Sequence, residues 1–191
     1  DKKDKPRISI TARLMADLLH TAGADRIVTM DLHAPQIQGF FRMPVDHLQA
    51  EPIIADHLRR RDLSDTVLVA GDAGEAKEVG AYANRLNLPM AIIDKRRTDD
   101  SEKPKPAHLI GDVENKHVIL VDDEVSTGRT LVEAAIYLKE QGARSITAAA
   151  THAVLAGEAI QRLTESCIEN FVFTDTLPLP ETIPPQFTVL T

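Results

Sequence analysis

The stretch HVILVDDEVSTGRT, residues 117–130, decides the fold of this chain. Its first five residues, 117–121, have the pattern of a buried strand that runs directly into Asp122 and Asp123. A turn rich in hydroxyl groups and glycine follows, and a helix is expected to start at about Thr130. Because open α/β sheets bind ligands at the carboxyl ends of their strands, the stretch predicts a ligand site here.

The turn after this strand carries the groups that a sugar phosphate needs. Gly128 lets the backbone approach a ligand closely, and the helix start offers unpaired N–H groups and a positive dipole end to a phosphate. The adjacent acids suit the vicinal hydroxyls of a ribose. A simpler interpretation is an acidic strand-to-helix turn with a good N-cap, but the joint placement of hydroxyls, glycine and paired acids favours the sugar phosphate. The hydroxyl donors are Ser126, Thr127 and Thr130.

Strands and helices alternate along the rest of the chain. This alternation predicts an α/β fold with a parallel sheet and flanking crossover helices. By contrast, Thr98–Ala107 is polar, carries two prolines and lacks apolar periodicity, so we expect a mobile loop there. The expected strands are 26–30, 66–70, 90–93, 117–121, 145–150 and 168–173; the expected helices are 9–21, one from 51, one ending near 86, 130–141 and 157–165.

The composition limits the classes of function. With 191 residues, 43% of them hydrophobic, the chain can bury a core as one domain or as parts of two. A formal net charge of −7 argues against binding to a nucleic acid polymer. No apolar run approaches membrane-spanning length, so we expect no membrane partner. The single Cys167 excludes an internal disulfide and fits a reducing cytoplasm, where we expect the protein to be located.

A cluster of cations follows the strand expected at 90–93. Lys95 and Arg97 are two residues apart, so on an extended backbone their side chains emerge on the same face. Two cations on one face suit an anionic ligand such as a phosphate group. A solvated basic strand end is the alternative.

Three segments resemble those of a known family. VDDEVSTGRT (121–130) is similar to the motif that binds phosphoribosyl pyrophosphate (PRPP) in type I phosphoribosyltransferases and in ribose-phosphate pyrophosphokinases. DLHAPQIQGFF (31–41), followed by PVD (44–46), resembles a signature of the pyrophosphokinases that ordinary phosphoribosyltransferases do not carry. IIDKRR (92–97) is similar to the strand that opens the pyrophosphokinases' catalytic loop. The chain therefore resembles the ribose-phosphate pyrophosphokinase family over most of its length.

This resemblance implies a type I phosphoribosyltransferase-like fold of two tandem related domains. Residues 1–46 would be the remaining part of the N-terminal domain, and residues 47–191 the C-terminal domain with the PRPP motif. We expect the boundary near 43–52, in a short link between two prolines. Because the family has further N-terminal and C-terminal segments, we expect a fragment whose first domain is incomplete and which is inactive or weakly active alone.

The resemblance also implies a reaction, in which ATP and D-ribose 5-phosphate give AMP and PRPP for nucleotide biosynthesis. His33 would be a Mg²⁺ ligand that contacts the ATP phosphates, and Asp72 a second Mg²⁺ ligand. The alternatives are a turn histidine that caps a helix and a turn or N-cap aspartate. Lys95 and Arg97 would be catalytic. The residues that would bind ribose 5-phosphate are Arg97, Asp122, Asp123, Ser126, Thr127, Gly128, Arg129 and Thr130.

The chain departs from the family's pattern in two loops. In the family's pyrophosphate loop, Ala70 and Gly71 stand where Ser and Pro are usual, and Glu75 stands where a second Gly is usual. A carboxylate near an anion site is unfavourable unless it points away. In the sugar-phosphate loop, Ser126 replaces Asp and Arg129 replaces Gly, and neither change forbids ribose 5-phosphate.

Two other functions stay open. A non-catalytic, PRPP-synthetase-like regulatory subunit is the first, although such proteins usually lose the catalytic segments that are present here. A phosphoribosyltransferase is the second, and the 31–46 signature opposes it. Because the family's sites lie between subunits of a dimer that often assembles into a hexamer, we expect a homo-oligomer whose ATP contacts come partly from another chain.

Overall fold

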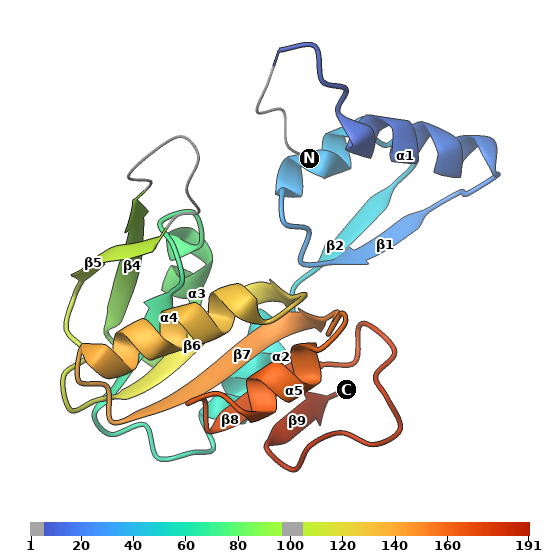
Figure 1. The fold of residues 1–191 in the computed structure, drawn as a ribbon. Helices are drawn as coiled ribbons and strands as arrows, with labels where there is room; N and C mark the ends of the chain where they lie inside the picture. The colour runs from blue at the N-terminus through green and yellow to red at the C-terminus, as the bar shows by residue number, and fades with distance from the viewer. Residues whose placement is uncertain (1–5, 97–104) are drawn as a thin grey trace. The chain divides into compact units, whose positions relative to one another are not determined.

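The computed structural model describes residues 6–96 and 105–191 (Figure 1). The chain divides into two compact units, one up to Ala50 and one from Glu51 to Thr191. Arg97 and most of the loop expected at 98–107 lie outside the described residues, and Lys95 is described by its backbone alone.

The smaller unit holds α1 (Thr11–Thr21), β1 (Ile27–Met30), the 3-10 helix η1 (Pro35–Phe40) and β2 (Val45–Leu48). β1 and β2 pair in parallel along their whole length. The guanidinium of Arg26 donates two hydrogen bonds to the Asp46 carboxylate beside this pairing, and they hold the pKa of Asp46 below its usual range. Residues 45–48 are therefore a strand, where the sequence predicted part of a link.

The larger unit is built on one seven-stranded sheet. The strands lie in the order β5-β4-β3-β6-β7-β8-β9, and all neighbours are parallel except β4 and β5. The predicted α/β fold with a parallel sheet and flanking helices is therefore confirmed. The elements are α2 (Glu51–Leu58), β3 (Thr66–Ala70), α3 (Ala76–Leu86), β4 (Met90–Arg96), β5 (Lys105–Ile110), β6 (His117–Val125), α4 (Arg129–Glu140), β7 (Ser145–Ala153), α5 (Ala159–Thr164), β8 (Asn170–Thr174) and β9 (Phe187–Leu190).

The chain winds outward in both directions from the centre of this sheet. From β3 it crosses through α3 to β4 on one side, and from β6 it crosses through α4 and α5 to β7 and β8 on the other. Since such crossovers are right-handed, α3 covers one face, while α4 and α5 cover the opposite face, which is toward the viewer in Figure 1. The winding direction reverses between β3 and β6, at the kind of switch point where open α/β sheets bind ligands.

Burial of apolar residues fixes the elements on each side of this switch point. All five residues of β3 are buried, as are residues 118–121 of β6, which is typical of parallel strands covered on both faces. On α4 the buried residues recur at helical spacing, so one face of the helix packs on the sheet and the β6–α4 turn is held at both ends. The buried residues of α4 are Leu131, Ala134, Ala135 and Leu138.

In the larger unit, β5, β6 and β9 differ most from the sequence expectation. β6 continues to Val125, because the backbone around the two acids still pairs with β7, with Asp122 opposite Ala150. β5 occupies 105–107 at the end of the expected loop, and its place at the sheet edge tolerates Pro106. β9 is a four-residue strand that the sequence did not indicate.

Within the described ranges, no helix has the length and apolar character needed to cross a membrane.

Candidate functional site

Two strand–turn–helix connections meet at the switch point. Ala70 at the end of β3 lies opposite Val121 of β6, so the loop after β3 and the acids at the end of β6 share the carboxyl edge of the sheet. A small cavity between them is lined by residues of both connections and of the first turns of α4. Its lining residues are Gly71, Glu75, Leu120, Val121, Asp122, Thr130, Leu131 and Ala134. Two of the predicted ribose 5-phosphate ligands, Asp122 and Thr130, therefore face the loop that carries Asp72.

The turn between β6 and α4 ends in a glycine with a left-handed backbone. Gly128 is the N-cap of α4 and adopts a left-handed conformation with φ of +70°. It is buried, and a Cβ at this position would lie 2.9 Å from the Leu163 Cδ2 atom. No side chain among the described residues makes a cap hydrogen bond at this helix start, which leaves the first-turn N–H groups for an anion.

The side chains around this turn differ in exposure. Thr127, Arg129 and Thr130 are exposed, and Ser126 is half-buried, so their polar groups stand at the surface of the carboxyl edge. Asp122 and Asp123 are half-buried within the last part of β6. The predicted sugar-phosphate ligands from 122 to 130 are thus brought together by one connection.

In the loop after β3, the side-chain carboxylates of the loop itself accept hydrogen bonds from its backbone N–H groups. Glu75 Oε2 accepts a hydrogen bond from the Gly71 backbone N–H at 2.8 Å. Asp72 Oδ1 accepts from the Gly74 and Glu75 backbone N–H groups at 2.8 and 3.3 Å. From the sequence, a carboxylate at position 75 was unfavourable near an anion site unless it pointed away. In the structure the Glu75 carboxylate instead points into the loop and accepts a hydrogen bond from its backbone. An incoming anion must therefore compete with Glu75 for the Gly71 N–H.

The pKa of Asp122 is raised by its surroundings. Burial, followed by the negative charge of Glu75 and by the hydrogen bond and charge of Asp123, raises the pKa of Asp122 to about 8. The Asp123 backbone N–H donates to Asp122 Oδ1 at 2.9 Å, which acts in the opposite direction but is the smaller effect. These surroundings favour the protonated carboxyl of Asp122, which can donate as well as accept a hydrogen bond.

His33 lies in the other unit, directly after β1, and its side chain is exposed. Its turn is held by neighbours: the Leu32 N–H donates to His47 Nε2 at 3.0 Å, and the Ala50 N–H donates to Asp31 Oδ2 at 3.1 Å. His47 thus has a structural role in this turn. In the part of the chain that the structure describes, no group of three or more His, Cys, Asp or Glu residues could hold a metal ion by itself.

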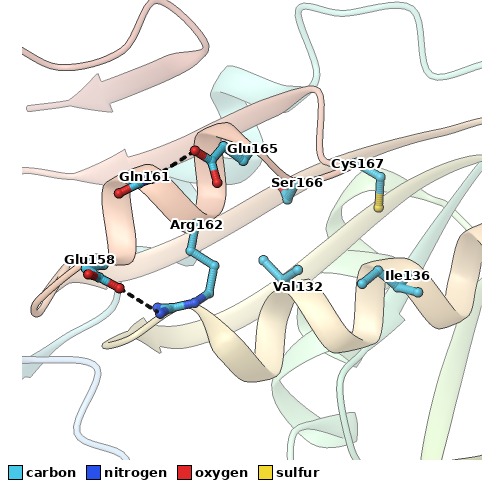
Figure 2. Close-up of a pocket in the computed structure, with 8 residues that line it drawn as sticks. All are labelled: Val132, Ile136, Glu158, Gln161, Arg162, Glu165, Ser166 and Cys167. Atoms are coloured by element: carbon cyan, nitrogen blue, oxygen red, sulfur yellow. Dashed lines mark hydrogen bonds and ion pairs between the residues drawn. The ribbon is translucent and has the colours of Figure 1, made fainter.

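Sequence reasoning missed the contacts made by α5. Arg162 donates to the Thr127 carbonyl oxygen at 2.5 Å, and Leu163 lies beneath Gly128. A larger open pocket lies between α4 and α5, with Arg162 and Glu158 at one end and Cys167 at the other (Figure 2). None of the predicted site residues lines it. Because α5 follows the turn by more than thirty residues, no local spacing in the sequence indicates these contacts.

The chain is similar in sequence to known proteins. Residues 97–183 match the family described as phosphoribosyl synthetase-associated domain. The chain is 52% identical over 182 residues to a ribose-phosphate pyrophosphokinase of Caldanaerobacter subterraneus, covering 95% of this chain and 57% of that protein. It is 48% identical over 185 residues to ribose-phosphate pyrophosphokinase 4 of Saccharomyces cerevisiae, covering 96% of this chain and 56% of that protein. The chain thus spans a little over half the length of the curated relatives it matches.

A solved structure is similar along the whole chain. It is the crystal structure of phosphoribosylpyrophosphate synthetase from Mycobacterium smegmatis, which matches with a TM-score of 0.91 at 43% sequence identity. The match covers 100% of this chain and 62% of the other. It confirms the type I phosphoribosyltransferase-like α/β fold that the three sequence motifs implied.

Proposed function

We propose that this chain, which belongs to the ribose-phosphate pyrophosphokinase family, binds D-ribose 5-phosphate and ATP and forms PRPP and AMP for nucleotide biosynthesis. The observation that carries this proposal is the meeting of two strand–turn–helix connections at the switch point of the sheet. One supplies paired acids and a helix start, and the other supplies the loop that carries Asp72. Such an edge suits a ligand with hydroxyls at one end and phosphate at the other.

In this proposal, the β6–α4 connection holds ribose 5-phosphate. The 5-phosphate lies at residues 126–130, where Ser126, Thr127 and Thr130 offer hydroxyls, Arg129 offers a cation and Gly128 lets the backbone approach. Asp123 accepts hydrogen bonds from the ribose hydroxyls. Asp122, whose surroundings favour its protonated form, both donates to and accepts from the sugar.

The transfer step needs charge stabilisation more than covalent chemistry. The anomeric hydroxyl of the sugar attacks the β-phosphorus of ATP, and AMP leaves. We assign Lys95 and Arg97 to the charge that develops on the transferred diphosphoryl group, with Arg97 also contacting the sugar phosphate. This assignment rests on the sequence, since neither side chain is among those described.

Mg²⁺ fits the oxygen donors at this edge. Mg²⁺ usually keeps several waters and is held by one or two carboxylates together with substrate phosphates, so a site with few protein ligands suits it. Asp72 uses Oδ1 for two backbone hydrogen bonds, and its second carboxylate oxygen is the donor we assign to the metal. We assign His33 to the Mg²⁺ and phosphates of ATP. When bound, the ion would neutralise phosphate charge and orient ATP.

We further propose a homo-oligomer, dimers assembling into a hexamer, in the cytoplasm. The remaining ATP contacts would come from a neighbouring subunit. Size-exclusion chromatography with light scattering measures the assembly directly, and a monomer at micromolar concentration would contradict it.

The test of the function is to measure AMP and PRPP formation from Mg-ATP and ribose 5-phosphate. Asp123→Asn should weaken ribose 5-phosphate binding at least tenfold, because it removes a charged acceptor. Asp112→Asn is the matched control: it removes an exposed carboxylate that precedes β6, at the opposite edge of the sheet, where it pairs with Lys116 at 2.7 Å. Loss of ribose 5-phosphate binding to the same degree in both variants, or no PRPP from the full-length protein, contradicts the proposal.

A further inference from the structure

One segment, residues 155–163, contacts three consecutive residues of the sugar-phosphate loop. The Ala156 backbone N–H donates to the Ser126 carbonyl at 2.9 Å, and Arg162 Nη1 donates to the Thr127 carbonyl at 2.5 Å. Leu163, which is fully buried, lies against Gly128. The loop is thus held from the side of the β7–α5 connection.

Holding these carbonyls also sets the direction of the loop's N–H groups. All peptide bonds in the described parts of the chain are trans, and in a planar trans peptide the C=O and the following N–H point in opposite directions. When the carbonyls of residues 126 and 127 point toward the 155–163 segment, the N–H groups of Thr127 and Gly128 point away from it. Two successive N–H groups before a helix start form the type of concavity that binds anions.

Arg162 is well placed to maintain this arrangement. Its side chain is only 28% exposed, and it extends from α5 across the end of the pocket between α4 and α5 (Figure 2). Glu158, one turn earlier, lies 3.9 Å from Nη2. A hydrogen bond from a charged donor is about twice as strong as a neutral one. The Arg162 guanidinium also puts a fixed positive charge behind the loop. Among these three contacts, this is the one that depends on a replaceable polar side chain.

We propose that Arg162 is a positioning residue for the 5-phosphate of ribose 5-phosphate. It holds the Thr127 carbonyl so that the Gly128 N–H is aimed at the phosphate, and it makes no contact with the reacting atoms. This inference rests on the proposed function of the 126–130 loop, and it adds a residue from a distant helix to the determinants of substrate binding.

The test compares Arg162→Met with a chemically matched control. Arg59 also donates to a backbone carbonyl, that of Arg85 at 2.9 Å, and also pairs with an acid one turn earlier, Asp56 at 3.0 Å. Because Arg85 lies at the C-terminal end of α3, this contact is at the sheet edge opposite the loop. Arg59→Met therefore removes the same kind of interaction without touching the site.

We expect Arg162→Met to raise KM for ribose 5-phosphate about tenfold or more. Its kcat and its KM for ATP should change less than twofold. Arg162→Lys, which restores a charged donor, should recover part of the loss, and Arg59→Met should resemble the wild type in all three constants. An unchanged KM for ribose 5-phosphate in Arg162→Met, or an equal loss in Arg59→Met, overturns the inference. If Arg162→Met does not fold, Arg162→Lys carries the test, with a KM rise above threefold expected because lysine lacks the guanidinium fork.

A failure of the proposed function gives a different result. If the wild-type protein forms no PRPP and does not bind ribose 5-phosphate, the function is wrong, and the inference is then judged by titrating inorganic phosphate into each variant. Weaker phosphate binding in Arg162→Met than in Arg59→Met supports loop positioning. Equal binding in the two overturns it.

Discussion

The Glu75 carboxylate accepts a hydrogen bond from the Gly71 backbone N–H at 2.8 Å, within the loop proposed to bind pyrophosphate. An acid of this protein thus occupies a backbone donor that an anionic substrate would use. The same charge acts on Asp122 across the switch point, where it is the second largest cause of that residue's raised pKa. Glu75 therefore couples the loop after β3 to the acids that end β6.

The first prediction concerns this coupling. Glu75→Gln removes the charge but keeps the size of the side chain, so it should lower the pKa of Asp122 from about 8. The pKa should stay above the usual range of an aspartate, because burial is the largest cause and Asp123 remains. Carboxyl ¹³C chemical shifts followed against pH measure the change. Glu114→Gln, at an exposed position before β6, is the control; an Asp122 that titrates identically in all three proteins would rule out the coupling.

The second prediction follows from the protonation of Asp122. The folded protein holds this proton up to pH about 8, whereas the unfolded chain releases it near pH 4. Between these values the folded state binds more protons, so this group's contribution to stability is complete below pH 4 and is lost as pH rises toward 8. Asp122→Asn cannot ionise and should not show this loss. Its stability relative to the wild type should rise by up to about 4 kcal/mol between pH 5 and pH 8.5, as measured by urea unfolding; a constant difference contradicts the raised pKa.

Much of the sheet was predictable because its centre is encoded locally. The apolar run 66–70 became β3 with the expected ends, and 117–130 became strand, turn and helix in the expected order. Short strands were harder to predict. β2 and β9 have four residues each, and they are strands because they pair with a neighbouring strand. β6 extends beyond its apolar run for the same reason, because its backbone continues to pair with β7 through the polar residues.

The candidate site was predictable only in its local part. Residues 122–130 follow one another, so their types and order indicate a sugar-phosphate loop. The contact of Arg162 with Thr127 and that of Glu75 with Gly71 join a side chain to a backbone group, and a backbone group has no signature in the sequence. The Arg162 contact also forms only after the fold has brought α5 next to the loop that follows β6.

The third prediction separates transition-state stabilisation from sugar binding. Lys95→Ala removes a cation that we assign to the developing charge on the transferred group, so it should lower kcat by ~10²-fold or more with little change in KM. Steady-state kinetics with varied ATP and ribose 5-phosphate measure both constants. Lys77→Ala, at an exposed position on α3, should leave both unchanged. A rise in KM with kcat preserved would assign Lys95 to substrate binding instead.

The last prediction concerns Gly128, where the loop is pressed against α5. Gly128→Ala introduces two costs: a non-glycine residue at φ of +70°, and a Cβ only 2.9 Å from Leu163 Cδ2. Gly157→Ala is the matched control, because Gly157 has φ of +60° but a Cβ there meets nothing within 4 Å. The control should lose ~1 kcal/mol of unfolding free energy from the backbone alone, and Gly128→Ala should lose about 1–3 kcal/mol more from overpacking.

Urea unfolding of the two variants, with Leu163→Ala added to each, isolates the contact. Removing the leucine should reduce the extra cost in Gly128→Ala, because the new methyl group then enters the space that Leu163 leaves, while the cost of Gly157→Ala stays as it was. Equal losses in the two glycine variants would mean that Leu163 yields freely to the new side chain. The loop would then be held by its hydrogen bonds to Ala156 and Arg162, without support from Leu163.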